Sequence, residues 1–272
     1  MSRSPSARVC MNKKRLFLLA GSLLLAYIGL CAEPRPVTGS VAIGSHTAVT
    51  PTPRPEREWW MPRHQAILER LAQGNVDLIW IGDSITHSWE EEGKDIWARY
   101  YASRNAVNLG CSGDRTQNVL WRLQNGEIDN IQPKVAIIMI GTNNSNRDEH
   151  TAEEIADGIK AIVITLREKL PETKILVLSI FPRGDATQKA LPIGNASYND
   201  QWAKNDQASR LASVLADDQM VFFLDINKAF LNEEGELTRE MMPDLLHPKE
   251  KGYQVWAETM EPTLMKLLGE TK

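Results

Sequence analysis

Ser84 is the residue of this sequence that is best placed to act as a nucleophile. It lies in Ile-Gly-Asp-Ser-Ile-Thr (81–86), directly after an apolar run, and Gly82 permits a sharp turn there. A serine at the start of a helix lies beside free backbone N–H groups, which suit a developing oxyanion. Gly-Asp-Ser is also an ordinary helix-capping sequence, so this segment alone fits a helix cap as well.

Asp244 and His247 have the types and the spacing of the base that such a serine needs. They lie three residues apart in Pro-Asp-Leu-Leu-His-Pro (243–248), between two prolines that restrict the backbone. An imidazole can accept the hydroxyl proton near neutral pH, and a carboxylate beside it fixes its tautomer and orientation. The segment alone also fits a capping aspartate followed by a solvated histidine.

Gly113 and Asn143 are candidates for the donors of an oxyanion hole. The backbone N–H of Gly113 and the side-chain amide of Asn143 could converge with the backbone N–H of Ser84 on a tetrahedral intermediate. Glycine and asparagine are also frequent turn residues, which explains either position when it is considered alone.

The remaining candidates have weaker support. His87 follows Ser84 by one helical turn and is interpreted as a pocket-wall or surface residue. His64 and His150 have no acidic or metal-like context in the sequence. Cys111 has no basic neighbour that would lower its pKa, so we expect a small buried filler. The tryptophans are expected in the core, with Trp89 close enough to line the site.

The composition is that of an ordinary globular protein. Of 272 residues, 42% are hydrophobic and 24% are charged, and the formal net charge is −4. Five of the 31 basic residues and none of the 35 acidic ones lie in residues 1–32, so the rest of the chain is markedly acidic and we expect no nucleic acid partner. Three cysteines without zinc-ligand spacing, and no phosphate-binding Gly-Lys-Ser/Thr loop, predict no metal and no cofactor.

The chain divides into three parts by composition. Residues 1–32 join a basic segment to the uncharged run Leu16–Leu30, which predicts an export signal or membrane anchor. Cleavage after Ala32, lipidation at Cys31 and a retained membrane anchor are left open. Residues 33–55 are rich in proline and predict a poorly packed linker. Residues 56–272 are expected to form the catalytic domain of an exported protein, as a monomer or a homo-oligomer.

Apolar runs of strand length alternate with helical patterns from residue 56 onward. This alternation predicts a parallel sheet covered by helices on both faces. Because the carboxyl ends of parallel strands meet at one edge, the polar segments after three of these strands (83–84, 111–113 and 142–144) should lie together. Strands are expected over 76–81, 106–109, 135–140, 174–180 and 220–224, and helices over 58–72, 114–124, 151–169, 196–216 and from after Pro248 to 268.

Taken in order, four segments resemble the motif blocks of the SGNH (GDSL) hydrolase superfamily. They are Ile-Gly-Asp-Ser-Ile-Thr (81–86), Asn-Leu-Gly-Cys-Ser-Gly-Asp (108–114), Ile-Gly-Thr-Asn-Asn (140–144) and Asp-Leu-Leu-His (244–247). The resemblance implies a flavodoxin-like, three-layer α/β/α fold, here with five strands. It also implies Ser84 as nucleophile, His247 as base, Asp244 as the group that orients it, and Ser84, Gly113 and Asn143 as oxyanion donors.

Within the superfamily, residues 112–134 and 244–253 are most similar to the catalytic subunits of the intracellular platelet-activating-factor acetylhydrolase family. The resemblance implies a tight acyl pocket walled by Ile85, Thr142 and Leu246, and therefore an acetyl-sized acyl group. Asn144 departs from the aspartate common in the superfamily.

An export signal is not a feature of an intracellular enzyme. The expected substrate is an ester in a small molecule or a polysaccharide, and its alcohol part is left open between carbohydrate and lipid. A lysophospholipase or thioesterase with a longer acyl pocket is the alternative enzyme. An inactive module that binds sugar or lipid in the same pocket is the non-enzymatic alternative.

Overall fold

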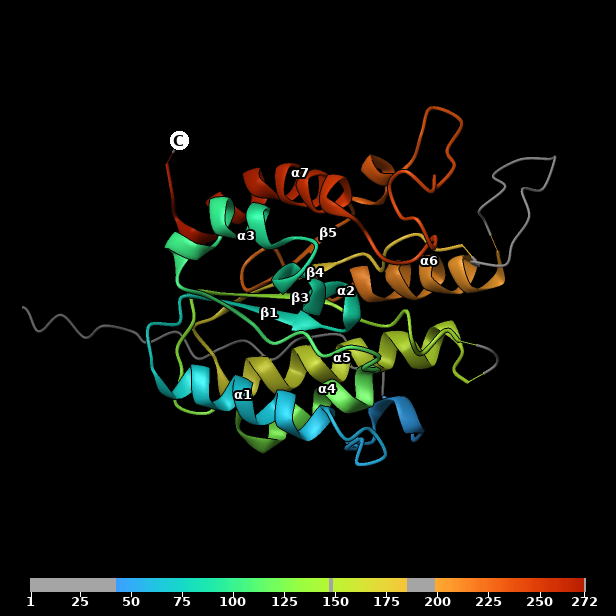
Figure 1. Ribbon diagram of the computed structural model, residues 1–272. Helices are drawn as coiled ribbons and strands as arrows, with labels where there is room; N and C mark the ends of the chain where they lie inside the picture. Colours follow the sequence, from blue (N-terminus) through green and yellow to red (C-terminus); the bar gives the residue numbers. More distant parts are fainter. Residues whose placement is uncertain (1–42, 147–148, 185–198, 272) are drawn as a thin grey trace, which may run out of the picture. The chain divides into compact units, whose positions relative to one another are not determined.

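The computed structural model describes residues 43–146, 149–184 and 199–271, and these contain a five-stranded, wholly parallel sheet (Figure 1). The strand order β2-β1-β3-β4-β5 is the flavodoxin-like order, so the predicted fold class is confirmed. The strands are β1 (Leu78–Gly82), β2 (Ala106–Asn108), β3 (Val135–Met139), β4 (Lys174–Leu178) and β5 (Val221–Leu224).

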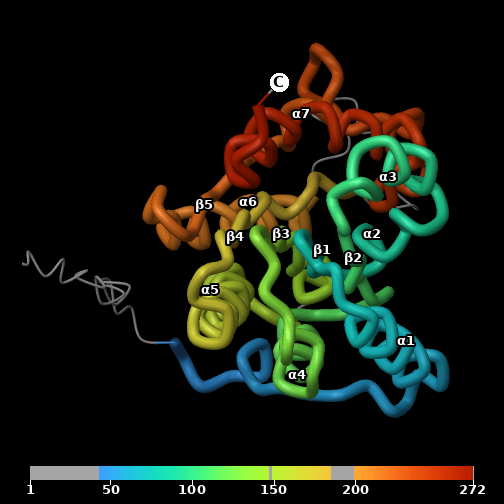
Figure 2. The backbone as a smooth tube through the Cα atoms, turned by 90° about the vertical axis from the view of Figure 1, so that its left-hand side faces the viewer, coloured from blue at the N-terminus to red at the C-terminus, as the bar shows by residue number. Residues whose placement is uncertain are grey.

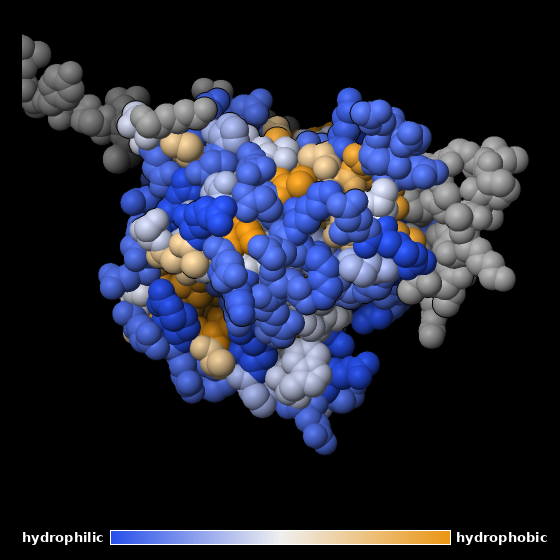
Figure 3. Space-filling model, turned by 45° about the horizontal axis from the view of Figure 1, so that its top comes forward, coloured by the Kyte–Doolittle hydropathy of each residue, from blue (hydrophilic) through white to orange (hydrophobic). Residues whose placement is uncertain are grey.

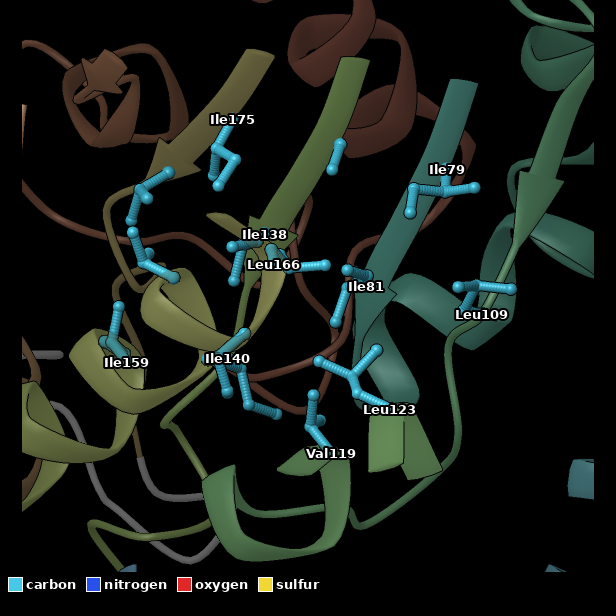
Figure 4. Packing of buried hydrophobic residues seen from close by; sticks show 14 of the residues in the cluster. Ile79, Ile81, Leu109, Val119, Leu123, Ile138, Ile140, Ile159, Leu166 and Ile175 are labelled. Carbon is cyan, nitrogen blue, oxygen red and sulfur yellow. The ribbon is translucent and has the colours of Figure 1, made fainter. Parts of the chain in front are cut away.

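Alternating side chains of the strands feed two separate hydrophobic clusters, one on each face of the sheet. Ile79 and Ile81 of β1 belong to the first cluster (Figure 4), whereas Leu78 and Trp80 belong to the second. The helices that contribute to the first cluster are α1 (Trp60–Ala72), α4 (Thr116–Arg122), α5 (Ala152–Lys169) and α6 (Asp200–Ser213). Those that contribute chiefly to the second are α3 (Lys94–Tyr100) and α7 (Glu250–Leu268).

The predicted strands and long helices lie within a few residues of their observed bounds; residues 196–198, at the start of one predicted helix, lie outside the described residues. The helix expected to begin at Ser84 is α2 (Ser84–His87), which has only four residues. The other short helix, α3, was not predicted, because seven residues are too few to show a hydrophobic period.

Residues 43–55 correct the predicted linker. Ala48, in the 3₁₀ turn Thr47–Val49, is buried, and its carbonyl accepts a 2.8 Å hydrogen bond from Thr116 Oγ1. The Thr52 N–H donates to the Gln117 carbonyl at 3.0 Å. The packed part of the chain therefore extends upstream of Glu56, because this segment finds hydrogen-bond partners on α4. Residues 1–42, with the predicted signal and the first part of the linker, lie outside the described residues.

Trp89 is a core residue rather than a wall of the site. It is fully buried in an aromatic cluster, with its ring 5.3 Å from that of Trp80 and 4.5 Å from that of Tyr253.

The outer surface seen in Figure 3 is mostly hydrophilic and carries small, separate hydrophobic patches. Over the described part of the chain, no helix has both the length and the apolarity needed to span a membrane.

Candidate active site

Ser84 is the first residue of α2, directly beyond the carboxyl end of β1. The turn between the two elements needs Gly82, since a Cβ there would press on Thr86 Oγ1 and lie 2.6 Å from the Met139 carbonyl oxygen. The Asp83 side chain caps α2 by accepting a 3.0 Å hydrogen bond from the Ile85 N–H.

The three residues predicted to act together are in contact. Ser84 Oγ lies 2.9 Å from His247 Nε2, and His247 Nδ1 lies 2.6 Å from Asp244 Oδ2. Ser84 and His247 are 163 residues apart in the chain, so the tertiary fold creates this pairing. The order hydroxyl, imidazole, carboxylate is the one in which a base can take the hydroxyl proton and a carboxylate can hold the imidazole.

A tight turn before α7 holds Asp244 and His247 in this geometry. Asp244 Oδ1 accepts backbone N–H bonds from Leu246 at 3.0 Å and from His247 at 2.8 Å. Leu245 between them is buried, with a left-handed φ of 58°. Burial by itself would raise the pKa of Asp244, but hydrogen bonds from the His247 ring and from this turn hold that pKa below its ordinary value. The carboxylate is therefore ionised and fixed in direction.

The candidate oxyanion donors come from the ends of three neighbouring strands. Gly113 adopts a left-handed φ of 74°, and in the described part of the chain no acceptor bonds its N–H or that of Ser84. Asn143 Nδ2 donates one hydrogen bond to the Asp114 carbonyl at 3.0 Å, which leaves its second N–H available. Each of the three groups therefore retains a donor for a ligand.

Asn144 has a structural role that differs from that of its neighbour. It is fully buried, its Oδ1 accepts from the Thr116 N–H, and its Nδ2 donates to Thr116 Oγ1 and Gln117 Oε1, all between 3.0 and 3.1 Å. An ionised aspartate could not donate to these two oxygens. The asparagine at position 144, in place of the aspartate common in the superfamily, therefore suits the acceptor oxygens that α4 presents to it.

The residues predicted to wall the acyl pocket differ in exposure. Ile85 and Thr142 are each 1% exposed, while Leu246 is only partly buried. Arg183 Nη1 holds Thr142 through its carbonyl at 2.9 Å, and Tyr253 Oη donates to the Ile85 carbonyl at 2.7 Å. Of the three, Leu246 presents the largest accessible surface beside the Ser84–His247 pair.

The weaker sequence candidates have definite places. His87 Nδ1 lies 3.0 Å from Ser112 Oγ, and burial, followed by the charge of Arg63, lowers its pKa. Cys111 is buried, and burial raises its pKa to about 12, so it is the inert filler that we expected.

His64 corrects the expectation that it has no acidic context, because its Nδ1 lies 2.8 Å from Glu127 Oε1. His150 instead bonds a hydroxyl, with its Nε2 2.7 Å from Thr47 Oγ1.

A buried ionic cluster behind the site was not predicted. Arg122 contacts Asp114 at 2.8 Å through Nε and Glu127 through Nη1, and all three side chains are inaccessible to solvent. Trp60 Nε1 donates to Asp114 at 2.7 Å. The spacing of the three charged residues in the sequence does not place them on one helix face, so it did not indicate that they are in contact. Among the described residues, no three His, Cys, Asp or Glu side chains are grouped so that they could hold a metal ion.

Known proteins resemble this chain in sequence and in fold. The model of the GDSL-like Lipase/Acylhydrolase family matches residues 80–255. The chain is 35% identical over 216 residues to platelet-activating factor acetylhydrolase IB subunit alpha2 of Rattus norvegicus, covering 78% of this chain and 86% of the relative. It is 33% identical over 212 residues to subunit alpha1 of Homo sapiens, covering 78% and 85%.

Solved structures share the fold at lower identity. A GDSL-like lipase from Bacteroides thetaiotaomicron has a TM-score of 0.57 at 17% identity, covering 75% of this chain and 97% of its own. A mutant of an acetyl-xylooligosaccharide esterase from Geobacillus Stearmophilus has a TM-score of 0.53 at 19% identity, covering 71% and 94%. The chain belongs to the GDSL-like lipase/acylhydrolase family of ester hydrolases.

Proposed function

We propose that this protein is a serine esterase that removes short acyl groups, above all acetyl, through Ser84, His247 and Asp244. The observation that carries the proposal is the pair of contacts at His247, 2.9 Å to the Ser84 hydroxyl and 2.6 Å to the Asp244 carboxylate. General-base activation of a hydroxyl requires a base within this range of distances.

The proposed reaction uses these contacts. His247 Nε2 takes the proton of Ser84 as Oγ attacks the ester carbonyl, and the Ser84 N–H, the Gly113 N–H and the Asn143 amide stabilise the negative oxygen. The protonated imidazole, held by Asp244, then gives its proton to the departing alcohol. Water attacks the acyl-Ser84 ester with the same base, which releases the carboxylic acid and restores the hydroxyl.

The size of the acyl group is inferred from the residues joined by the backbone to this machinery. Ile85 follows Ser84, Thr142 precedes Asn143 and Leu246 precedes His247. The fixed, buried positions of Ile85 and Thr142 leave Leu246 as the wall that could yield to a longer chain. The acetylhydrolase relatives and the acetyl-xylooligosaccharide esterase fold neighbour add support for acetyl.

The alcohol part is proposed as a carbohydrate, with a platelet-activating-factor-like lipid as the other candidate. The carbohydrate is favoured by the export signal expected in residues 1–32, because an exported esterase meets extracellular polysaccharide. Export is itself a proposal that rests on sequence alone.

The test is a hydrolysis panel on the purified protein. Acetate, butyrate and octanoate nitrophenyl esters should be turned over in falling order, because an extra methylene forced into a closed pocket costs about 1–3 kcal/mol. Ser84→Ala and His247→Ala should each lose at least about 99% of kcat, since general-base nucleophilic catalysis contributes about 10²-fold or more. Ser213→Ala, on α6, is the matched control and should keep full activity.

The results separate the alternatives. Preference for octanoate would favour the lysophospholipase or thioesterase, and no hydrolysis of any ester would favour a binding module. Leu246→Ala should raise kcat/KM for butyrate relative to acetate if Leu246 limits the pocket. Acetylated xylan and a platelet-activating-factor analogue in the same panel distinguish the two alcohol classes.

A further inference from the structure

We propose that Arg54 is a positioning residue for the oxyanion hole, supplied by the segment upstream of α1. This inference rests on the proposed function, because it concerns how the Gly113 N–H and the Asn143 amide are aimed. It assigns an enzymatic role to a residue that lies outside the four motif blocks and outside the region matched by the family model, residues 80–255.

Arg54 lies against the oxyanion loop, Ser112–Asp114. Its side chain is 10% exposed, and Nη1 donates to the Ser112 carbonyl at 2.9 Å and lies 3.4 Å from Asp114 Oδ1. A Cβ at Gly113 would be only 2.9 Å from Arg54 Nη1. The guanidinium therefore packs directly over Gly113, the residue of the loop that has no side chain.

The bond to the Ser112 carbonyl controls the direction of the Gly113 N–H. The two groups belong to one peptide unit, which is planar and trans, so the N–H points opposite to the carbonyl. Fixing the oxygen with a charged donor fixes the N–H as well. Accepting a charge-assisted hydrogen bond also polarises the peptide, which makes its N–H a stronger donor to an oxyanion.

The same loop positions the second donor. The Asp114 carbonyl accepts the 3.0 Å bond from Asn143 Nδ2 that orients the Asn143 amide. The Asp114 carboxylate is held by Trp60 Nε1 at 2.7 Å and by Arg122 Nε at 2.8 Å. Arg54 differs from these two groups because it also bonds the loop backbone next to Gly113.

The position of Arg54 is itself well defined. Pro53 and Pro55 flank it and restrict its backbone. Thr52 is tied to α4 in both directions, by its N–H to the Gln117 carbonyl at 3.0 Å and by its carbonyl to Asn118 Nδ2 at 2.9 Å. Figure 2 shows this segment, in blue, passing alongside α4 before α1 begins. The guanidinium is thus held in place before any substrate binds.

The test compares Arg54→Ala with Arg57→Ala, which removes an exposed arginine of the same segment. With nitrophenyl acetate, Arg54→Ala should lower kcat about 10- to 100-fold, the cost of misplacing a catalytic group by about 1 Å, and leave KM within about twofold. Added guanidinium at millimolar concentration should restore part of kcat in Arg54→Ala only. Arg57→Ala should match the unaltered protein.

Two further variants keep the test decisive. If Arg54→Ala does not fold, Arg54→Lys, which keeps the charge but ends in a single ammonium instead of the planar guanidinium that places Nη1 beside both loop oxygens, should fold and lower kcat at constant KM. In the Asn143→Ala background the effect of Arg54→Ala should shrink, because one of the donors that it aims is gone. A kcat within twofold of the unaltered protein, a pure KM effect, or strictly multiplicative effects would overturn the proposal. Full activity of Ser84→Ala would instead overturn the proposed function, whatever Arg54 does.

Discussion

Two adjacent asparagines differ in their contacts, and variants can separate the catalytic role proposed for Asn143 from the structural role of Asn144. Asn143→Ala should lower kcat by about 10²–10³ with little change in KM, because an oxyanion bond forms chiefly in the transition state. Asn144→Ala should instead lower the free energy of unfolding by about 1–3 kcal/mol, because it leaves buried groups on α4 unpaired. Steady-state kinetics and thermal melts of both variants check this. A KM effect alone would assign Asn143 to substrate binding.

Asp83, next to Ser84, should make the free energy of unfolding depend on pH. Burial raises its pKa from 3.8 to about 7, against the hydrogen bond from the Ile85 N–H. Below pH 4 the carboxyl is protonated in both the folded and the unfolded chain. Between about pH 4 and pH 7 the unfolded chain is ionised while the folded chain still holds the proton, so the stability present at low pH is lost progressively as the pH rises to 7.

Asp83→Asn removes this titration and isolates its effect. The amide keeps an oxygen for the Ile85 N–H, and its own cost does not vary with pH. The Tm of the variant minus that of the unaltered protein should therefore increase between pH 5 and pH 8.5. Melts across this range measure the difference, and a constant difference would show that Asp83 ionises as readily in the fold as in water.

At the scale of elements, residues 43–55 act as part of the domain rather than as a tether. A chain that starts at Glu56 should melt at least about 5 °C below one that starts at Gly39. The shorter chain lacks the buried Ala48 and the hydrogen bonds of Thr52 to α4, and each bond contributes about 1 kcal/mol. Calorimetry of the two chains decides the point, and equal melting temperatures would restore the linker interpretation.

At the scale of the whole molecule, every step of the proposed reaction is assigned to a protein group. In the proposal His247 is the base, Ser84 is the nucleophile, and N–H donors stabilise the developing charge. Activity on nitrophenyl acetate should therefore survive dialysis against EDTA within experimental error. Loss of activity that a divalent ion restores would require a different source for the nucleophile or for the stabilisation of the oxyanion.

The strand–helix alternation, the fold class and the residues expected to react can all be predicted from the amino-acid sequence. These features are locally encoded, since hydrophobic period marks each element and the polar residues follow the strand ends directly. Parallel strands then place those ends at one edge of the sheet, which is why the sequence alone is enough to group Ser84, Gly113 and Asn143.

The groups that support the site are instead a product of tertiary packing. Trp60 and Asp114 are 54 residues apart, Arg54 and Ser112 are 58 apart, and His64 and Glu127 are 63 apart. The hydrophobic period of a helix or strand does not reveal such partners, because they come from different elements that pack against one another. The same reason explains why the proline-rich segment looked like a linker: its hydrogen-bond partners lie on α4, a helix that follows more than 60 residues later in the chain.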